Sequence, residues 1–252
     1  MQRYFIAADN WKADNHIVLS ANDYHHITRV MRMTEGDKII CNHPYCQAAI
    51  CVITNISNEQ VIAAVEEWLN DSVEMPVNVT VAQGLPKGDK FDLVLQKGTE
   101  LGASAFLPFE AKRSVVKWDS KKAKKKLERF NKIVKEASEQ AHRNRIPSIE
   151  EVSPFQKLLE KSKAYDVKLV AYEEETRSEQ YHSLGSILKE IDQNQSVLIC
   201  IGPEGGFTLE EINALKEVGF YTVRLGPRIL RTETAALYFL SSISYHFEEL
   251  EW

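Results

Sequence analysis

From residue 77 onwards, continuous apolar runs alternate with amphipathic segments, and this rhythm constrains the fold more than any other feature of the sequence. Apolar runs of strand length occupy residues 77–83, 105–109, 167–172, 196–202 and 221–226. Helical spacing of apolar residues marks residues 87–101, 120–142, 155–161, 209–218 and 233–250. Strands without polar alternation are buried on both faces, so we expect an α/β fold in which helices cover both faces of a mostly parallel sheet.

Residues 1–70 have a different pattern, in which short β-like runs are separated by turns. These runs are residues 3–7, 37–42, 47–57 and 60–69. One helical segment, 22–33, interrupts them and places Ile27, Val30 and Met31 on one face. The pattern predicts a small β-barrel domain covered by a helix. The polar stretch that ends in Pro76 is the expected linker, so the predicted boundaries are 1–70 for the barrel, 71–76 for the linker and 77–252 for the α/β domain.

Charge is distributed unevenly along the chain. The formal net charge is -5, and 44% of the 252 residues are hydrophobic, as expected for a folded protein. Residues 112–145 hold thirteen Lys and Arg against four acidic residues, a local balance of +9. The remainder therefore carries -14, and this asymmetry favours an anionic partner that binds one face of the molecule.

Several classes of protein are disfavoured by the sequence. The four cysteines lack zinc-type spacing, and the adjacent His25 and His26 point about 100° apart on a helix, so we expect reduced thiols and no metal. Asp9 interrupts the N-terminal apolar stretch, which argues against a secretory signal. No apolar run approaches the roughly 18 residues of a membrane span. We therefore expect a soluble, cytoplasmic protein.

The glycine-rich segment "IGPEGGFTLEE", residues 201–211, follows an expected strand. Ligands of open parallel sheets bind beyond the carboxyl ends of the strands, so this loop is a candidate site, as are the loops after Tyr172 and Leu225. Thr208 and Glu211 have the spacing of a capping box. The segment has neither the phosphate-loop nor the dinucleotide glycine pattern, so an ordinary glycine-rich turn is the alternative interpretation.

The segment "LGPRILRTETA", residues 225–235, is the second unusual loop. Adjacent Ile229 and Leu230 are uncommon in a solvated loop, which predicts that this loop is packed inside the protein. Thr232 is placed to cap the last helix. The two arginines at 228 and 231 either pair with nearby carboxylates or hold an anionic ligand, and the residues alone leave both alternatives open.

Together these two loops resemble the RsmE family of small-subunit ribosomal RNA uridine-N3 methyltransferases, in the SPOUT superfamily. The resemblance extends through the segments "HHITRVMRMTEGDKI", "KGDKFDLVLQKGTELG", "KRSVV" and "EASEQAHRNRIP". It implies a PUA-like β-barrel followed by an α/β domain whose end forms a trefoil knot, with Ile229 and Leu230 buried in the knot. It also implies S-adenosyl-L-methionine as cofactor, and a uridine of 16S RNA, presented by the assembled small ribosomal subunit, as substrate.

Residue roles are carried over from the resemblance position by position. The implied cofactor-binding residues lie in the three loops: Tyr172, Ile201, Gly202, Glu204, Gly205, Gly206, Leu225, Gly226, Ile229, Leu230 and Thr232. A homodimer is also implied, and the last helix offers it an apolar stripe, which would equally serve the core: Ala236, Phe239, Leu240, Ile243, Phe247 and Leu250.

Arg231 and Glu233 are the candidate catalytic residues. Uridine N3 carries a proton that must leave for the methyl group to be accepted. Arg231 would stabilise the uridine anion, and Glu233 would accept the proton directly or through water. The alternative, in which Glu233 only stabilises the helix N-terminus and pairs with an arginine, stays open.

The basic stretch supplies the candidate RNA contacts. Phosphate is best gripped by guanidinium groups, so the expected contacts on the α/β domain are Arg113, Gln140, Arg143 and Arg145, together with the lysine-rich helix. Those expected on the barrel are Arg3, His25, Arg29 and Arg32. Solvated charges without a partner are the alternative for each of them.

Two other functions are compatible with the residues. A non-catalytic RNA-binding assembly factor would share the fold, and calorimetry with the cofactor would distinguish it from an enzyme. A nucleotide-binding oxidoreductase is less compatible with the sequence, because the first strand and helix of the α/β domain lack the dinucleotide glycine fingerprint.

Overall fold

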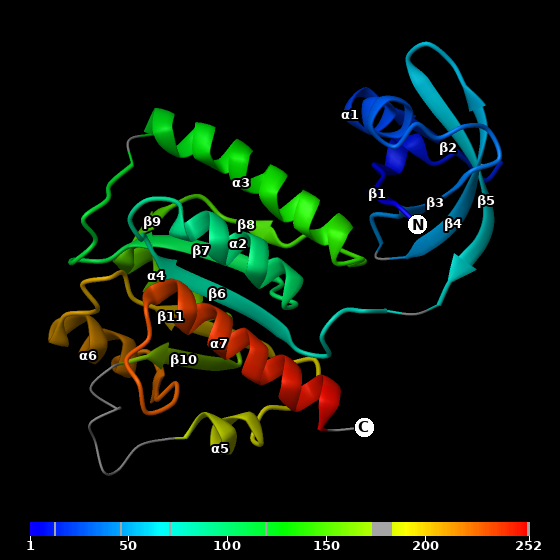
Figure 1. The fold of residues 1–252 in the computed structure, drawn as a ribbon. Helices are drawn as coiled ribbons and strands as arrows, with labels where there is room; N and C mark the ends of the chain where they lie inside the picture. The colour runs from blue at the N-terminus through cyan, green and yellow to red at the C-terminus, as the bar shows by residue number, and fades with distance from the viewer. Residues whose placement is uncertain (13, 46, 71, 119, 173–182, 251–252) are drawn as a thin grey trace. The chain divides into compact units, whose positions relative to one another are not determined.

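The structure is a computed structural model that describes residues 1–12, 14–45, 47–70, 72–118, 120–172 and 183–250. Its contacts divide the chain into two compact units (Figure 1). The first unit comprises Met1–Glu74 and Ser138–Arg145, and the second comprises Met75–Ala137 and Ile146–Trp252. The segment Ser138–Arg145, which is distant in sequence, therefore joins the N-terminal unit. The expected domain boundaries, which stay a prediction, did not include this segment in the barrel domain.

The first unit is built on a five-stranded sheet in the order β1-β3-β4-β5-β2. One face of this sheet packs around fully buried aliphatic and aromatic side chains, among them Tyr4, Ile17 and Ile39. The strands are β1 (Arg3–Phe5), β2 (His16–Ser20), β3 (Lys38–Asn42), β4 (Ala48–Ile56) and β5 (Gln60–Leu69). The short strand β2 was not expected, and the other four correspond to the predicted runs.

The helical segment of this unit is less regular than expected. Helix α1 (Ala21–His25) passes into a π-helical turn, His26–Val30, in which the Met31 N–H donates to the His26 carbonyl. The wider i→i+5 turn rotates the following residues out of α-helical register. Ile27 is buried, but Val30 is 59% and Met31 43% exposed, so only Ile27 of the three residues assigned to one helix face packs into the core.

The second unit contains a wholly parallel sheet in the order β12-β10-β11-β6-β7-β8, with β9 also paired to β7 (Figure 1). The strands are β6 (Asn78–Gly84), β7 (Ala105–Glu110), β8 (Ser148–Ile149), β9 (Ser153–Pro154), β10 (Val167–Ala171), β11 (Ser196–Ile201) and β12 (Tyr221–Val223). The five predicted strands are confirmed; β8 and β9 are two-residue strands that carry no periodic signal.

Helices cover both faces of this sheet, as predicted. They are α2 (Lys90–Glu100), α3 (Ser120–Gln140), α4 (Phe155–Ser162), α5 (Leu184–Leu188), α6 (Leu209–Glu217) and α7 (Thr232–Ser244), which continues into a π-helical turn, Tyr245–Glu249. In β11, Val197 and Ile199 belong to the core under α2, α5 and α7, whereas Leu198 and Cys200 belong to the core under α4 and α6. Burial on both faces explains why the strands are continuously apolar.

The stripe on the last helix serves mainly the core. Ala236, Phe239, Leu240 and Ile243 are fully buried and Phe247 is 5% exposed, whereas Leu250 is 58% exposed. The trefoil knot is not established by strand order and stays a prediction.

Candidate active site

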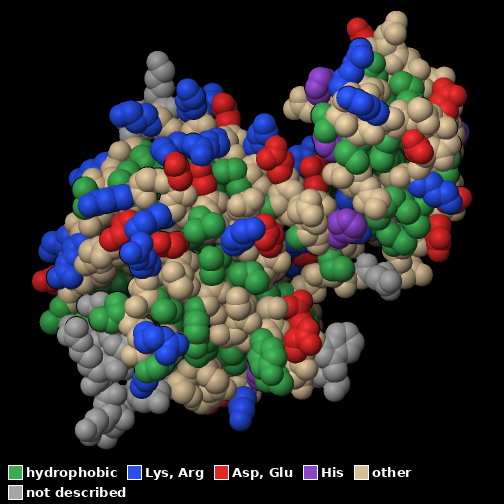
Figure 2. All heavy atoms as spheres, in the orientation of Figure 1, with side chains coloured by type: hydrophobic (Ala, Val, Ile, Leu, Met, Phe, Trp, Pro, Cys, Tyr) green, Lys and Arg blue, Asp and Glu red, His purple; other side chains and the backbone are tan. Residues whose placement is uncertain are grey.

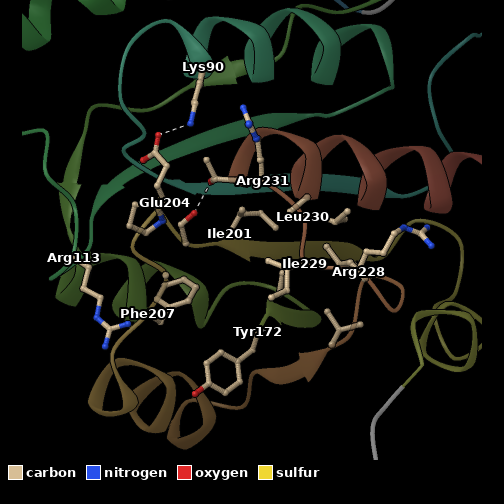
Figure 3. Close-up of a pocket in the computed structure, with 18 of the residues that line it drawn as sticks. Lys90, Arg113, Tyr172, Ile201, Glu204, Phe207, Arg228, Ile229, Leu230 and Arg231 are labelled. Carbon is tan, nitrogen blue, oxygen red and sulfur yellow. Dashed lines mark hydrogen bonds and ion pairs between the residues drawn. The ribbon is translucent and has the colours of Figure 1, made fainter. Parts of the chain in front are cut away.

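A cavity of about 580 Å³ opens in the second unit beyond the carboxyl ends of β10, β11 and β12 (Figure 3). Nine of the eleven implied cofactor-binding residues line it: Tyr172, Ile201, Gly202, Glu204, Gly206, Leu225, Ile229, Leu230 and Thr232. Gly205 and Gly226 belong to the same loops but are not part of the lining. The sheet thus brings the two unusual loops together around one space, as the position of ligands in parallel sheets predicts.

The first loop leads from β11 into α6 and is held at its far end by the expected capping box. The Thr208 N–H donates to Glu211 Oε2 at 2.9 Å, and the Glu211 N–H donates to Thr208 Oγ1 at 3.3 Å. A neighbouring segment fixes the loop from outside, since the Lys112 N–H donates to Glu211 Oε1 at 2.7 Å and Arg113 Nη1 donates to the Gly205 carbonyl at 3.1 Å.

Glycine at position 84 allows the first loop to pass close to the end of β6. A Cβ at Gly84 would lie 2.6 Å from Pro203 Cδ and 2.7 Å from Pro203 N, closer than real contacts allow. Gly206 has φ +65 and lines the cavity, and a Cβ there would meet no atom within 4 Å in the part of the chain that the structure describes. The backbone of this loop is therefore accessible to a ligand.

Thr232 joins the two loops. Its hydroxyl donates to the Gly202 carbonyl at 2.6 Å and accepts a hydrogen bond from Gln83 Nε2 at 2.7 Å, and all these groups are buried. The expectation that Thr232 caps α7 was wrong, because Arg231 occupies the N-cap and makes no side-chain capping bond. The threonine hydroxyl instead makes its hydrogen bonds to Gly202 and Gln83, which lie at the ends of β11 and β6.

The second loop differs from the expected buried connection. Ile229 is 60% exposed, although it lines the cavity, and Leu230 is only partly buried against the core. The prediction that Ile229 is packed inside the protein was wrong, since its side chain faces open space that a bound ligand would fill (Figure 3).

Charged side chains gather at one end of the cavity, where Lys90 and Glu204 belong to the lining and Glu233 does not. Lys90 Nζ lies 2.8 Å from Glu204 Oε1 and 3.7 Å from Glu233 Oε2, and Glu204 Oε1 also accepts the Lys87 N–H at 3.0 Å. Burial alone would raise the pKa of Glu204, but the hydrogen bonds from Lys90 and Lys87 outweigh it and hold that pKa below its ordinary value. Arg231 lines the same cavity (Figure 3), and Glu233 pairs with a lysine, not with the arginine that the alternative interpretation considered.

Other lining residues were missed by sequence reasoning. They include Lys90, Pro203, Phe207 and Ala235, while Arg113, assigned above to RNA, also lines this cavity. Lys90 carried one usable signal, since it lies just beyond a strand whose carboxyl end belongs to the same edge of the sheet. Its contact with Glu204 spans 114 residues and depends on strand order, which local sequence patterns do not give.

Two arginines assigned to RNA lie inside the first unit. Arg143 is 2% and Arg3 6% exposed, and Arg3 Nη1 donates to the Arg143 carbonyl at 3.0 Å. Glu74 pairs with Arg143 and with Arg145 Nε, the latter at 3.0 Å, and it also accepts the Asn144 N–H at 2.9 Å. We call this group, Arg3, Glu74, Arg143, Asn144 and Arg145, the Glu74 cluster. An RNA contact by Arg143 would require it to leave Glu74, so that role stays an untested prediction.

The remaining RNA candidates lie at the surface. His25, Arg29 and Arg32 are exposed on the helical segment of the first unit, and Gln140 is exposed at the end of α3. They are accessible to a macromolecular partner, and their contact with RNA stays a prediction.

No group of His, Cys, Asp or Glu within the described residues could hold a metal ion. Cys41, Cys51 and Cys200 are buried free thiols, and Cys46 lies outside the described residues. Among the helices that the structure describes, none has the length and apolar character needed to cross a bilayer.

Comparison with known proteins identifies the family. Residues 73–244 match the model of the RNA methyltransferase domain, and residues 19–66 match that of the RNA methyltransferase PUA domain. The ribosomal RNA small subunit methyltransferase E of Bacillus subtilis is 48% identical over 252 residues, which cover 99% of this chain and 98% of that protein. This chain belongs to the ribosomal RNA small subunit methyltransferase E family.

More distant relatives match most of the chain. The ribosomal RNA small subunit methyltransferase E of Mycobacterium tuberculosis is 33% identical over 231 residues, covering 90% of this chain and 85% of its own. The methyltransferase E of Neisseria gonorrhoeae, solved with bound S-adenosyl methionine, has a TM-score of 0.85 at 29% identity and covers 98% of both chains. A putative methyltransferase from Legionella pneumophila, also solved with this cofactor, has a TM-score of 0.83 at 28% identity and covers 97% of both chains.

Proposed function

We propose that this protein is an S-adenosylmethionine-dependent methyltransferase that methylates N3 of a specific uridine in 16S ribosomal RNA of the small subunit. The observation that carries this proposal is the convergence of the two motif loops on one cavity, in a chain 48% identical along its whole length to a small-subunit methyltransferase E. We further propose that the enzyme acts on the assembled subunit in the cytoplasm.

The cavity fits the proposed cofactor in size and in lining. Its volume of about 580 Å³ is within the range that holds ligands of this size. Ile201, Leu225 and Leu230 supply apolar walls for an aromatic base, and the first loop, with Gly202 and Gly206, offers accessible backbone groups. These residues would hold the cofactor mainly through shape and main-chain hydrogen bonds.

The cofactor supplies an electrophilic methyl carbon on a sulfonium, which becomes a neutral thioether when that methyl group is transferred. Residues of this chain then have two tasks, since the N3–H bond of uridine must break and the base must be held in line. Glu233, with a buried Oε2 atom that has no hydrogen-bond partner within the described part of the chain, would accept the proton. Arg231 would stabilise negative charge on the uracil oxygens.

The basic face of α3 is the proposed RNA surface of the second unit. Figure 2 shows Lys and Arg side chains gathered over this helix, and Lys122, Lys124 and Lys125 are exposed there. Each exposed lysine contributes little alone, but together they would attract the phosphate backbone. Binding should therefore weaken steeply as the salt concentration rises.

A second copy of the chain is the proposed partner of the exposed apolar residues in the second unit. Tyr238 on α7 is 38% exposed, and Tyr245 and Leu250, which follow along the chain, are each 58% exposed. Ile229 at the cavity is 60% exposed. A homodimer through this region would cover aromatic and aliphatic side chains of the kind that interfaces favour.

Methyl transfer to ribosomal RNA tests the proposal directly. Unmodified small subunits and free 16S RNA are incubated with methyl-labelled cofactor, and the labelled nucleotide is mapped. We expect label on N3 of one uridine, with small subunits labelled faster than free RNA. Label on another base atom would overturn the N3 assignment, and binding of the cofactor without transfer to either RNA would overturn the enzymatic one.

A further inference from the structure

Lys90 is placed where three segments of the second unit meet. It is the first residue of α2, whereas Glu204 lies in the loop after β11 and Glu233 in the first turn of α7. Its ammonium group lies 2.8 Å from Glu204 Oε1 and 3.7 Å from Glu233 Oε2 (Figure 3 shows the bond to Glu204). A flexible lysine is thereby fixed at the edge of the cavity.

The ammonium group retains donors for a ligand. Lysine carries three N–H donors, and among the described residues one of them is used, in the hydrogen bond to Glu204. The Lys90 side chain is 31% exposed and lines the cavity, so the remaining donors are accessible from the space that a substrate would enter. Glu204 accepts a second hydrogen bond, from the Lys87 N–H, which fixes the carboxylate that holds Lys90.

A second cation lies on the same side of the cavity. The hydrogen bond to Glu204 is the main cause that raises the pKa of Lys90, and the positive charge of Arg231 acts in the opposite direction because the two cations are near each other. Both residues line the cavity and reach it from different elements (Figure 3). Two neighbouring cations in a cavity can stabilise a negatively charged oxygen atom of a bound substrate.

We propose, resting on the methyltransferase function proposed above, that Lys90 is a further catalytic residue that contacts a uracil carbonyl oxygen. Loss of the N3 proton places negative charge on the two carbonyl oxygens that flank N3. Lys90 and Arg231 would share this charge, and Glu233, which lies near Lys90, would receive the proton. Glu204 has a separate task, which is to aim the Lys90 ammonium.

Lys90 could instead contact the carboxylate of the cofactor, which is also a negatively charged oxygen group. A contact with the cofactor would change cofactor affinity, whereas a contact with the uracil would change the rate of methyl transfer. The test compares Lys90→Met with the wild type by calorimetry with S-adenosylmethionine and by methylation of small subunits at saturating cofactor. We expect a loss of roughly 100-fold in kcat with cofactor Kd changed less than about threefold. Lys90→Arg should retain more than a tenth of the rate, since it keeps the charge.

The matched control is Lys157→Met, which removes an exposed lysine from α4 and should leave kcat, KM and cofactor affinity unchanged. If Lys90→Met fails to unfold cooperatively, Lys90→Gln takes its place. If Lys90→Met keeps the wild-type kcat, or loses only cofactor affinity, the catalytic role of Lys90 is overturned and the proposed methyltransferase function is not. A wild-type protein that transfers no methyl group to small subunits would instead overturn the proposed function as well.

Discussion

The hydroxyl of Thr232 links the two loops of the site through hydrogen bonds to Gly202 and Gln83. Thr232→Val keeps the shape of the side chain but leaves the Gly202 carbonyl and the Gln83 amide without this partner. Burial of such unsatisfied groups costs about 1–3 kcal/mol, so we expect lower stability and weaker cofactor binding. Urea unfolding and calorimetry measure the two effects.

Thr234→Val is the matched control, because Thr234 is exposed on the same helix. It should change neither stability nor cofactor affinity appreciably. Equal behaviour of the two variants would show that the link between the loops contributes nothing measurable.

Arg231 and Glu233 are expected to act on the substrate and not on the cofactor. Arg231→Ala and Glu233→Gln should therefore bind S-adenosylmethionine with nearly wild-type affinity while losing roughly 100-fold in methylation rate. Single-turnover methylation of small subunits measures the rate, and Glu190→Gln, an exposed position after α5, serves as control. Full activity in both variants would end their catalytic assignment.

At the level of elements, the site depends on how closely the loop after β11 approaches the end of β6. Gly84→Ala would place a Cβ 2.6 Å from Pro203 Cδ, so the loop must shift. We expect at least tenfold weaker cofactor binding, since displacements of an ångström matter in a preorganised site. Calorimetry with the cofactor measures this loss.

The control for this change is Gly185→Ala in α5, where an added Cβ would meet no atom of the described residues within 4 Å. Alanine is favoured over glycine in a helix, so this variant should be neutral or slightly stabilised. Tight cofactor binding by Gly84→Ala would show that the first loop tolerates displacement.

The strands and most helices of the second unit could be predicted because burial on two faces leaves a direct mark on the sequence. The loop motifs were visible for a similar reason, since glycines and a capping box mark sharp turns such as that between Ile201 and Leu209. Contacts between distant segments leave no such mark. Lys90 and Glu204 meet through the order of strands in the sheet, and Arg143 is charged like a surface residue although it is buried.

For the whole molecule, the Glu74 cluster is the feature that ties distant parts of the chain together. Glu74 and Arg143 have side chains that are only 10% and 3% exposed. Removing one member of such a buried pair typically costs about 3–5 kcal/mol, because the other charge is left without a partner. We expect Glu74→Gln to lose stability of this order at pH 7 in urea unfolding followed by tryptophan fluorescence.

This loss should depend on pH in a defined direction. Burial tends to raise the pKa of Glu74, but hydrogen bonds and charge from Arg143, with further contributions from Asn144 and Arg145, bring it below its ordinary value. A lowered folded-state pKa contributes stability above the unfolded-state value of about 4.5, and this contribution disappears as the pH falls through the folded value. The gap between wild type and Glu74→Gln should therefore narrow below pH 4.5.

Glu66→Gln is the comparison for the Glu74 variant. Glu66 pairs with Lys38 at 2.6 Å, but the two side chains are 44% and 49% exposed. Solvated ion pairs contribute less than about 1 kcal/mol, so this variant should unfold almost like the wild type. A similar loss in both variants would contradict a special role for burial in the Glu74 cluster.

Because Ser138–Arg145 belongs to the first unit, that unit is not encoded by one continuous stretch of the gene. A gene fragment ending near codon 76 would specify all five strands of the first sheet and yet omit the partners of Glu74. If recombination exchanged this unit between relatives, it would have to transfer both Met1–Glu74 and Ser138–Arg145. Otherwise Glu74 would face residues from a different relative in place of its own partners. The two stretches are therefore expected to be inherited, and to change, as a single set.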